Sequence, residues 1–545
     1  MIPSYTHGAS TEPLIGRTVG AMLDEVAGEF PPNEALVSIF EGRRYTYAQF
    51  LDQVNGCARA LIALGVAKGD RVGIWSTNCA AWVVVQFATA KAGAVLVNIN
   101  PAYRVPEVAF AINQSETKWL IIGGGFRDAK YAETIAGLAG KLPNLQRVIS
   151  LIPAEGLMEW SEFLHGGGGI APAVLREREA ALDFDDVINI QYTSGTTGSP
   201  KGAMLTHHNI LNNGFQVGER MRLTYHDRLC IPVPFYHCFG MVLANLACVT
   251  HGATMVLPAP HFSPLETLTA VALERCTALH GVPTMFIAEL DHPRFAEFDL
   301  STLRTGIMAG APCPVEVMKR VMSEMHLPEI TIACGMTETS PVCNMTEVDD
   351  PLEMRVGTVG KVMPHQEQKI IDPATGGIVP RGEPGELCYR GYQVMRGYFN
   401  DPAATRRTID DAGWLHGGDL AVMDERGYVR IVGRLKDMIC RGGEKVFPRE
   451  VEEFLFTHPK IAEASVIGVP DEYYGEQVMA WVKLKDGAML TREELLAYCR
   501  GRIMDYKIPA YVKFVTAFPT TVTGKIQKFR IREESARELG LKAKV

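Results

Sequence analysis

The sequence predicts an α/β protein that has a large N-terminal domain of several subdomains and a small α+β domain at the C-terminal end. Three observations support this fold class. The length of 545 residues exceeds what one core usually organises, which favours two or more domains. Short apolar runs alternate with amphipathic stretches through most of the chain, as in layers of strands and helices. From about residue 434 this rhythm gives way to a compact α+β pattern.

The expected N-terminal domain covers residues 1–433. The apolar runs RVGIW, AVLVNI, KWLIIGG, RVISLI and TMVLPA predict strands. The stretch 47–65 predicts a helix, because its apolar residues recur three and four positions apart. The four glycines at 166–169 predict a surface loop within the domain, since the α/β rhythm resumes at DVINIQ.

The expected C-terminal domain covers residues 434–545 and opens with the basic segment GRLKDMICRGGEKVFP. Pro448 begins a predicted helix, and the runs ASVIGV and VMAWVKL predict strands. Thr491 and Glu494 have the spacing of a capping box at the start of another helix. The face of the first helix that we expect to be buried holds Val451, Phe454 and Leu455.

The composition is that of a globular protein with a small negative charge. Hydrophobic residues make up 47% and charged residues 21%, which argues against a disordered chain, a fibre or a disulfide scaffold. The net charge is −8 and no basic stripe is present, so nucleic acid is not an expected partner.

The cysteines and the apolar stretches bear on location. The 12 cysteines are scattered without C-x-x-C pairs, which predicts reduced, mostly buried thiols and a cytoplasmic protein. The first residues lack the pattern of a signal or transit peptide. The longest apolar stretch is interrupted by Gln86, Lys91 and Gly93, so no membrane span is expected.

Residues 192–209, YTSGTTGSPKGAMLTHHN, follow the expected strand VINIQ. Glycines let backbone amides turn inward, hydroxyls add donors, and Lys201 adds a compact positive charge. The glycines are Gly195, Gly198 and Gly202, and the hydroxyls belong to Thr193, Ser194, Thr196, Thr197 and Ser199. This composition suits a phosphate-binding loop, although the ending is not that of a Walker A motif. The same composition is also compatible with a merely flexible surface loop.

This loop and four later segments together resemble the signatures of the acyl-adenylate-forming superfamily. The later segments are CGMTETSP (334–341), GELCYRGYQVMRGYF (385–399), WLHGGDLAVMDERGYVRIVGRLKDMICRGGEKVFPREVE (414–452) and TVTGKIQKFRIRE (521–533). They occur in the family's order, at similar separations, over almost the whole chain. The superfamily contains acyl-CoA synthetases, luciferases and peptide-synthetase adenylation domains. The likeness is closest to medium-chain fatty acyl-CoA synthetases, and it implies a mobile C-terminal domain.

The resemblance implies a ligase that uses ATP, Mg²⁺ and coenzyme A. An ionised carboxylate is a poor electrophile, so it needs a leaving group. In the implied reaction the carboxylate attacks the α-phosphorus of ATP and releases pyrophosphate, and the thiol of coenzyme A then displaces AMP. Because the reactants carry like charges, positive charge and oriented donors are the main catalytic resource.

The resemblance also implies which residues bind the nucleotide. Thr337 lies near the α-phosphate, Glu338 holds magnesium, and Asp419 accepts from the ribose hydroxyls with Arg434 beside it. The residues that line the β- and γ-phosphates are Thr193, Ser194, Gly195, Thr196, Thr197 and Lys201. Taken alone, Glu338, Asp419 or Arg434 would be ordinary surface charges.

Three further segments receive implied roles in the C-terminal domain. Lys525 resembles the mobile lysine that reaches the acyl carboxylate and the α-phosphate during adenylation. Lys436 matches the hinge about which the domain rotates between the two half-reactions. Gly442 and Gly443 allow close backbone approach in a loop that would border the pantetheine channel.

The acyl pocket is expected at PFYHCFGMV (234–242) and GIMAGAPCP (306–314). His237 matches a position between the carboxylate site and the acyl tunnel, although a lone histidine in an apolar run is otherwise a core residue. Gly310 and Ala311 are small and leave room for the substrate. The apolar residues expected to line a tunnel, or else simply to be core, are Phe239, Met241 and Met308.

Two positions depart from the family pattern. Cys334 stands where many relatives have an aromatic residue that stacks on adenine, and Gly417 replaces a threonine before Asp419. The first departure removes a stacking partner and the second removes a side-chain donor, but neither removes a group that the chemistry needs, and whether they weaken ATP binding stays open.

The sequence does not specify the acid, which could be a short substituted acid, thioether-bearing or aryl, in place of a medium-chain one. It also leaves open a carrier-protein thiol as acceptor, a luciferase-like oxidation and a catalytically silent scaffold. A homodimer is expected only because dimers are common.

Overall fold

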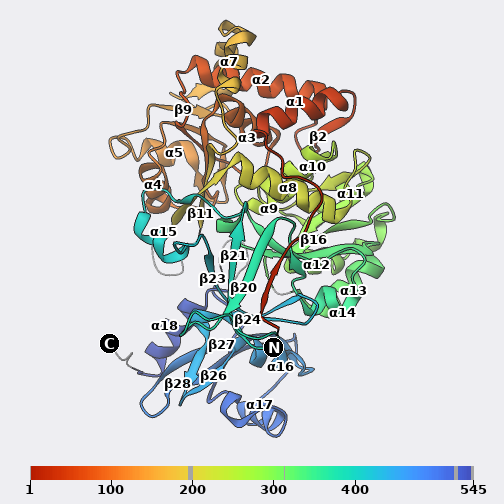
Figure 1. Cartoon of the computed structure of the whole chain (residues 1–545), viewed down its shortest axis with the longest axis vertical. Helices are drawn as coiled ribbons and strands as arrows, with labels where there is room; N and C mark the ends of the chain where they lie inside the picture. The colour runs from red at the N-terminus through yellow and green to blue at the C-terminus, as the bar shows by residue number, and fades with distance from the viewer. Residues whose placement is uncertain (1, 194–199, 312, 521–525, 542–545) are drawn as a thin grey trace. The chain divides into compact units, whose positions relative to one another are not determined.

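The computed structural model describes residues 2–193, 200–311, 313–520 and 526–541. The chain forms two compact units. The larger unit comprises residues 6–368 and 389–415, and the smaller unit comprises residues 1–5, 369–388 and 416–545. Each unit is described separately, with element labels as in Figure 1. The expected domain boundary between residues 433 and 434 stays a prediction.

The larger unit holds an eight-stranded sheet whose order is β10-β9-β6-β4-β5-β11-β12-β22. Neighbours from β10 to β11 run parallel, while β12 is antiparallel to both β11 and β22. The strands span Met158–Glu159, Arg147–Ser150, Trp119–Ile122, Arg71–Trp75, Val95–Asn98, Val187–Thr193, Lys201–Thr206 and Gly397–Tyr398 in that order. The strands predicted at RVGIW, AVLVNI, KWLIIGG, RVISLI and VINIQ are therefore confirmed.

A nine-stranded sheet in the same unit has the order β19-β18-β17-β16-β15-β13-β14-β2-β3. The six strands from β17 to β2 are parallel, and the outer pairs are antiparallel. The strands span Lys361–Val362, Val342–Met345, Glu329–Gly335, Thr305–Ala309, Ala278–Gly281, Arg228–Cys230, Thr254–Leu257, Glu34–Ser38 and Arg43–Thr46 in that order. The run TMVLPA forms β14, as expected.

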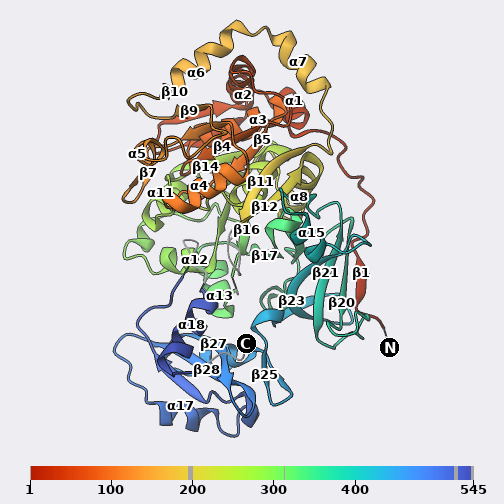
Figure 2. The same ribbon diagram turned by 90° about the vertical axis from the view of Figure 1, so that its left-hand side faces the viewer.

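Helix α3 (Ala80–Ala92) lies against strands of both sheets, β5 and β2, and almost all of its residues are buried (Figure 2). This burial explains why its sequence is apolar all round rather than along one stripe. The largest apolar cluster joins α1 (Val19–Glu29), α2 (Tyr47–Ala63), α3 and α8 (His207–Met221) to strands of both sheets. The core of the unit therefore lies between the two sheets.

Helix α2 begins with a capping box between Thr46 and Gln49, which confirms the helix predicted at 47–65. The segment 166–169 lies at the surface as predicted, since Gly166, Gly168 and Gly169 are exposed, but it forms a helix end and a turn instead of a loop. Helix α6 (Trp160–Gly166) runs into a 3₁₀ turn, η1 (Gly167–Gly169), that packs against α2. Gly167 is buried, and a Cβ atom there would lie 2.7 Å from the backbone nitrogen of Ala60. Glycine is thus required for close approach of the two backbones.

The larger unit contains further helices. They are α4 (Val105–Gln114), α5 (Tyr131–Ala136), α7 (Pro172–Ala180), α9 (Cys238–Gly240), the π-helix η2 (Met241–Leu246), α10 (Ala247–Thr250), α11 (Pro264–Glu274), α12 (Pro283–Leu290), η3 (Phe295–Glu297), α13 (Val315–Glu324), η4 (Thr337–Thr339), α14 (Leu352–Gly357) and α15 (Pro402–Thr408). Strands β7 (Gly125–Phe126) and β8 (Ala129–Lys130) form a separate hairpin. No helix among the described ranges has both the length and the apolar character needed to cross a membrane.

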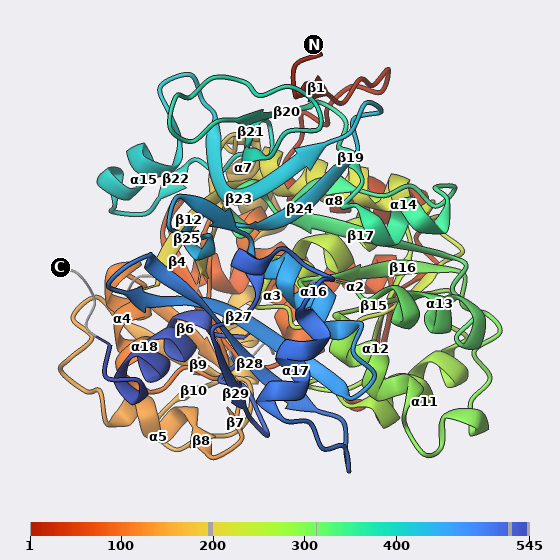
Figure 3. The ribbon, with the colours of Figure 1, turned by 90° about the horizontal axis from the view of Figure 1, so that it is seen from below.

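The smaller unit contains a sheet ordered β26-β25-β28-β27, in which β29 also pairs with β28. Figure 3 labels four of these strands, β25, β27, β28 and β29. The strands span Glu444–Val446, Ile439–Arg441, Gly475–Leu484, Ile461–Asp471 and Tyr511–Phe514. Side chains of α16 (Pro448–Phe456) and α17 (Arg492–Cys499) share an apolar cluster with one set of strand residues, and Ile531 of α18 (Lys528–Glu538) shares a cluster with the other set. The sheet is therefore covered on both faces, because alternate strand residues point to opposite sides.

The predicted elements of this unit are confirmed. Pro448 is the first residue of α16, whose Val451 and Leu455 are buried and whose Phe454 is partly buried. The run ASVIGV lies in β27 and VMAWVKL lies in β28. Thr491 and Glu494 form the capping box of α17.

One further sheet has the order β1-β20-β21-β23-β24. Its strands span Tyr5–His7, Gln366–Ile371, Gly385–Gly391, Leu415–Met423 and Val429–Arg434. The division between the units falls inside β1, β20, β21 and β23. A short 3₁₀ helix, η5 (Leu435–Asp437), follows β24 directly, and another, η6 (Asp505–Lys507), precedes β29.

Candidate nucleotide and acyl site

The two ends of the predicted phosphate loop meet at the edge of a strand pair. Thr193 is the last residue of β11 and Lys201 is the first residue of β12, and the two are register partners. The hydroxyl of Thr193 donates to the carbonyl oxygen of Lys201 at 3.4 Å. The predicted residues Ser194, Gly195, Thr196 and Thr197 lie outside the described residues. The structure thus shows that strand β11 precedes the predicted loop and that strand β12 follows it.

Gly202 does not turn amides inward as its place in the motif suggested. It lies within β12 opposite Tyr192, and a Cβ atom there would lie 2.8 Å from Cγ2 of Ile190. The glycine therefore allows close packing of the strand.

Lys201, Tyr398 and Glu338 lie together although they come from three segments. The ammonium nitrogen of Lys201 lies 5.0 Å from the centre of the Tyr398 ring, within the range of a cation–π contact. The Tyr398 hydroxyl donates to Oε1 of Glu338 at 2.6 Å. Strand β22 holds Tyr398 in place through its pairing with β12. The structure thus brings two predicted residues to one aromatic side chain that had no predicted role.

Burial sets the electrostatics of this group. Glu338 and Tyr398 are each only 6% exposed. Burial, together with the negative charge of Glu338, raises the pKa of the Tyr398 hydroxyl above its ordinary value. Tyr398 therefore remains protonated at neutral pH and can only donate to the carboxylate.

The turn that carries Thr337 and Glu338 is held by its own hydrogen bonds. Thr339 donates its hydroxyl to the carbonyl oxygens of Met336 and Pro341 at 2.9 and 2.8 Å. A Cβ atom on Gly335 would lie 1.8 Å from the carbonyl oxygen of Pro341, so only glycine fits there. The turn presents Glu338 from a rigid backbone.

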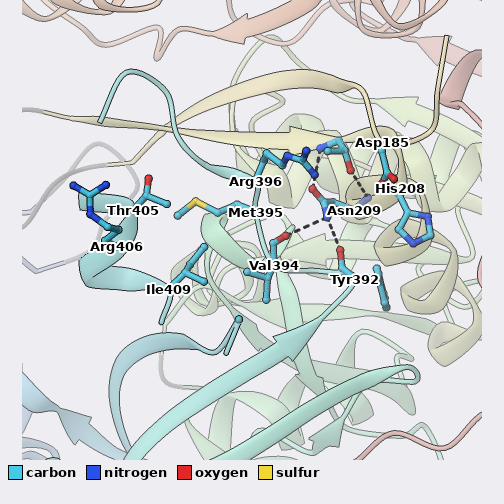
Figure 4. A pocket seen from close by; sticks show the side chains of 12 residues that line it. Asp185, His208, Asn209, Tyr392, Val394, Met395, Arg396, Thr405, Arg406 and Ile409 are labelled. Atoms are coloured by element: carbon cyan, nitrogen blue, oxygen red, sulfur yellow. Dashed lines mark hydrogen bonds between the residues drawn. The ribbon is translucent and has the colours of Figure 1, made fainter. Parts of the chain in front are cut away.

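Asn209 of helix α8 forms hydrogen bonds to residues 392–394, which precede Tyr398 in the chain (Figure 4). The side-chain amide of Asn209 donates to the carbonyl oxygens of Tyr392 and, at 3.2 Å, Val394. The amide of Met395 donates to the backbone carbonyl of Glu338 at 2.9 Å. These residues border a cavity of about 390 Å³, and none of the described residues that line it is a predicted site residue. The cavity adjoins the group around Tyr398, because the lining residue Thr405 accepts from the backbone amide of Tyr398 at 2.9 Å.

The expected acyl segment is tied to strand β11 by one buried glutamine. The side-chain amide of Gln191 donates to the carbonyl oxygen of Tyr236 at 3.1 Å, and the Cys238 thiol donates to Oε1 of Gln191. Gln191 precedes Thr193 by two residues, so it links the nucleotide loop to the segment around His237. Burial raises the pKa of the Cys238 thiol, which keeps the donor proton in place. Sequence patterns did not predict a role for Gln191, because they do not show which partners the side chain of a polar strand residue meets in the fold.

His237 is not a core residue. Its side chain is exposed, and its Nδ1 atom accepts from the backbone amide of Phe239 at 3.2 Å as the cap of α9. Phe239 and Met241 are buried in the large apolar cluster, while Met308 belongs to a second cluster with Phe286. Their contact with a substrate stays a prediction.

The two small residues that were expected near the substrate follow strand β16. Gly310 has a φ of 87°, a conformation that favours glycine, and Ala311 is exposed. Both lie in the larger unit with Lys201 and Glu338.

Cys334, the first departure from the family pattern, lies in β17, where it pairs with Asn344.

The predicted ribose-binding residues form an ion pair in the smaller unit. Asp419 of β23 and Arg434 of β24 are register partners, with 2.6 Å between Oδ1 and Nε. Arg434 also donates to the carbonyl oxygen of Gly417 at 3.4 Å. Gly417 is buried, so the departure from the family's threonine falls at a packed position.

The other predicted residues of this unit lie in and before its sheet. Lys436 lies in η5, directly after β24. Gly442 and Gly443 connect β25 to β26 with φ values of 59° and 91°. A Cβ atom on Gly442 would also lie 2.9 Å from Cδ1 of Tyr474. Lys525 lies outside the described residues.

Comparison with known proteins assigns matches to almost the whole chain. Residues 23–399 match the AMP-binding enzyme family, and residues 450–525 match the AMP-binding enzyme C-terminal domain. A putative acyl-CoA synthetase of Bacillus subtilis, YngI, is 49% identical over 96% of this chain and 98% of its own. The medium-chain acyl-CoA ligase ACSF2 of Danio rerio, a mitochondrial protein, is 43% identical over 99% of this chain and 91% of its own.

A solved structure gives the same result for the fold. The ATP-bound MatB of Rhodopseudomonas palustris aligns with a TM-score of 0.83 and 29% sequence identity, over 95% of this chain and 99% of that chain. The two proteins therefore share one fold.

Proposed function

Because the chain belongs to the family of AMP-binding enzymes, we propose that it is an ATP-dependent acyl-CoA synthetase for a medium-chain aliphatic acid. It activates the acid as an acyl-adenylate, transfers the acyl group to coenzyme A, and releases AMP and pyrophosphate. The observation that carries the proposal is the arrangement of Lys201, Tyr398 and Glu338 at the end of the β11–β12 pair. A cation and a buried carboxylate beside a glycine- and hydroxyl-rich loop suit a magnesium polyphosphate.

The described donor set fits magnesium. Glu338 offers a carboxylate whose orientation is held by Tyr398, and hard cations prefer such oxygen ligands together with phosphate oxygens. Magnesium bound there neutralises phosphate charge. Tyr398 holds the carboxylate in one orientation, and the rigid turn at 335–341 limits its movement.

For the first half-reaction, we assign charge neutralisation and positioning to the chain's own residues. Lys201, with Thr193 and the loop residues Ser194, Gly195, Thr196 and Thr197, binds the β- and γ-phosphates. Thr337 lies by the α-phosphate. The acid's carboxylate then meets the α-phosphorus in a less negative environment, which lowers the barrier to attack.

For nucleotide orientation, we assign the ribose hydroxyls to Asp419. Two carboxylate oxygens can accept hydrogen bonds from two hydroxyls, and the ion pair with Arg434 keeps the carboxylate in one rotamer. Lys525 donates to the acyl carboxylate and the α-phosphate during adenylation. The second half-reaction then follows rotation about Lys436, with Gly442 and Gly443 bordering the pantetheine channel.

For the acid, we assign His237 to the entrance of the acyl pocket, with Gly310 and Ala311 beside it. A medium-chain acid is favoured by the name of the ACSF2 relative. Short substituted acids remain in the same reaction class, since one methylene in an apolar pocket changes binding by only about 1–3 kcal/mol. The proposed partners are the acid, ATP and coenzyme A. We further propose a cytoplasmic location and a homodimer; the mostly buried thiols support only the first.

The test is AMP formation from ATP and magnesium with a panel of acids from acetate to palmitate, including aryl and thioether-bearing acids. Each acid is assayed with and without coenzyme A. AMP turnover that requires coenzyme A and peaks at intermediate chain length supports the proposal. Pyrophosphate release that coenzyme A does not change points to a carrier-protein acceptor, and no release with any acid contradicts an enzymatic function.

A further inference from the structure

Three side chains with metal-binding atoms lie together in the smaller unit. Glu386 and Cys388 are two positions apart on β21, so their side chains share one face of the strand. His416 lies on β23, the neighbouring strand of the sheet. None of the three had a role predicted from sequence.

The distances between their ligand atoms match those of a tetrahedral zinc site. Nδ1 of His416 lies 3.1 Å from Oε2 of Glu386 and 3.6 Å from Sγ of Cys388. Atoms at ordinary zinc–sulfur, zinc–nitrogen and zinc–oxygen bond lengths are about 3.6 Å apart for sulfur and nitrogen, and about 3.4 Å for nitrogen and oxygen, when the bond angles are tetrahedral. All three atoms lie within 4.8 Å of one another.

Two of the three side chains are buried, and the third is partly open to solvent. Cys388 is fully buried and Glu386 is 8% exposed, whereas the His416 side chain is 30% exposed. The amide of Gly418 donates to Oε1 of Glu386 at 3.3 Å, which leaves Oε2 directed at the histidine. Three protein ligands with access from the histidine side leave a fourth position for water, as in zinc sites that keep one open position.

We propose that Glu386, Cys388 and His416 form a binding site for a divalent cation of the zinc type. A set of sulfur, nitrogen and oxygen ligands favours such an ion over magnesium, which prefers oxygen alone. The thiol loses its proton to solvent when the metal binds, so the thiolate and the carboxylate together balance the two charges of the ion.

This site is distinct from the magnesium site proposed at Glu338, which belongs to the larger unit. Its position suggests what the metal does. His416 and Gly418 precede Asp419 in β23, and a bound metal would hold this stretch against β21. Metal occupancy is therefore expected to change the KM for ATP, a second effect that rests on the proposed role of Asp419.

The experiment is a titration of the full-length, chelator-treated protein with Co²⁺, which reports a thiolate ligand by a charge-transfer absorption band. We expect one equivalent to bind with this band and Zn²⁺ to displace it. Cys388→Ser should abolish the band, and Glu386→Gln should weaken binding at least about tenfold. Circular dichroism establishes that each variant is folded.

Cys440→Ser is the matched control, because Cys440 is an exposed thiol of the same unit that could bind Co²⁺ by itself. The control should keep the band. If wild-type protein binds no stoichiometric Co²⁺ with a thiolate band, or if the band survives in Cys388→Ser, the site does not exist. Loss of the band in Cys440→Ser alone also overturns the proposal. If Cys388→Ser does not fold, undiminished binding in folded Glu386→Gln and His416→Gln overturns it, and weakened binding supports it.

Discussion

The hydroxyl of Tyr398 donates a 2.6 Å hydrogen bond to the carboxylate of Glu338, and both side chains are buried. The same tyrosine presents its ring to the ammonium group of Lys201. One aromatic side chain therefore sets the orientation of a carboxylate and stabilises a cation that together suit a magnesium nucleotide. The hydrogen bond is the first relationship to test, because removing a hydroxyl leaves the ring and its packing in place.

Tyr398→Phe should raise the KM for magnesium–ATP by roughly tenfold, since loss of a group that orients a metal ligand commonly weakens metal binding about 10–100-fold. The readout is the magnesium dependence of adenylate-driven pyrophosphate release. Tyr131→Phe is the control, because Tyr131 is also buried and donates to a backbone carbonyl oxygen, that of Pro101, instead of to a carboxylate. An unchanged magnesium dependence in Tyr398→Phe would contradict the role proposed for the hydroxyl.

Lys525→Ala should block adenylate formation and largely spare thioester formation from a supplied acyl-adenylate. A lysine that contacts the carboxylate and the α-phosphate stabilises charge in the first half-reaction alone. The two half-reactions are measured separately, by pyrophosphate release and by acyl-CoA formation. Lys528→Ala is the control, because Lys528 forms an ion pair with Glu452 and has no proposed role in catalysis. Equal loss of both half-reactions in Lys525→Ala would show that the lysine has some other role.

Cys238→Ala should raise the KM for the acid and lower the free energy of unfolding by about 1–3 kcal/mol, because the buried Oε1 atom of Gln191 loses its donor. Cys238→Ser keeps a donor at this position and should behave much more like the wild type. Steady-state kinetics with varied acid and urea denaturation check both effects. Identical behaviour of the alanine and serine variants would mean that the thiol contributes only by its packing.

The stability of the protein should fall between pH 6.5 and pH 4 in part because of His280. Burial lowers the pKa of His280 from 6.5 to about 4, and its Nε2 atom donates to the carbonyl oxygen of Leu243. The unfolded chain takes up this proton below about pH 6.5, whereas the folded chain does so only near pH 4. The contribution is therefore fully present above pH 6.5, and it is lost on acidification by roughly 1.4 kcal/mol per pH unit.

His280→Asn should show a shallower loss of stability over this window in urea denaturation at several pH values. His207, whose pKa is lowered to about 3 by burial, keeps its own contribution in both proteins, so some slope remains. His226→Asn, at an exposed position, is the control and should keep the slope of the wild type. A slope that does not change in His280→Asn would contradict the argument.

Part of the fold could be predicted from local patterns. The strands RVGIW, VINIQ and VMAWVKL, and the helices after Thr46 and Pro448, follow from apolar periodicity and capping residues, which depend on near neighbours. The four glycines at 166–169 were predicted as a loop but form a helix end and a turn, and only the neighbouring helix α2 shows that Gly167 is needed for packing. The predicted roles of Thr193, Lys201, Glu338 and Asp419 came from resemblance rather than from such patterns.

The amino-acid sequence by itself determined the family, the order of the site segments and some of the strands and helices of both units. Only the tertiary structure decided which side chains meet. It places Tyr398 beside Glu338, Gln191 beside Cys238, and Cys388 beside His416. Local elements depend on residues a few positions apart, whereas these contacts join segments 28–60 positions apart along the chain. Which of many polar residues meet is set by strand order and register, and these follow from packing of the whole core.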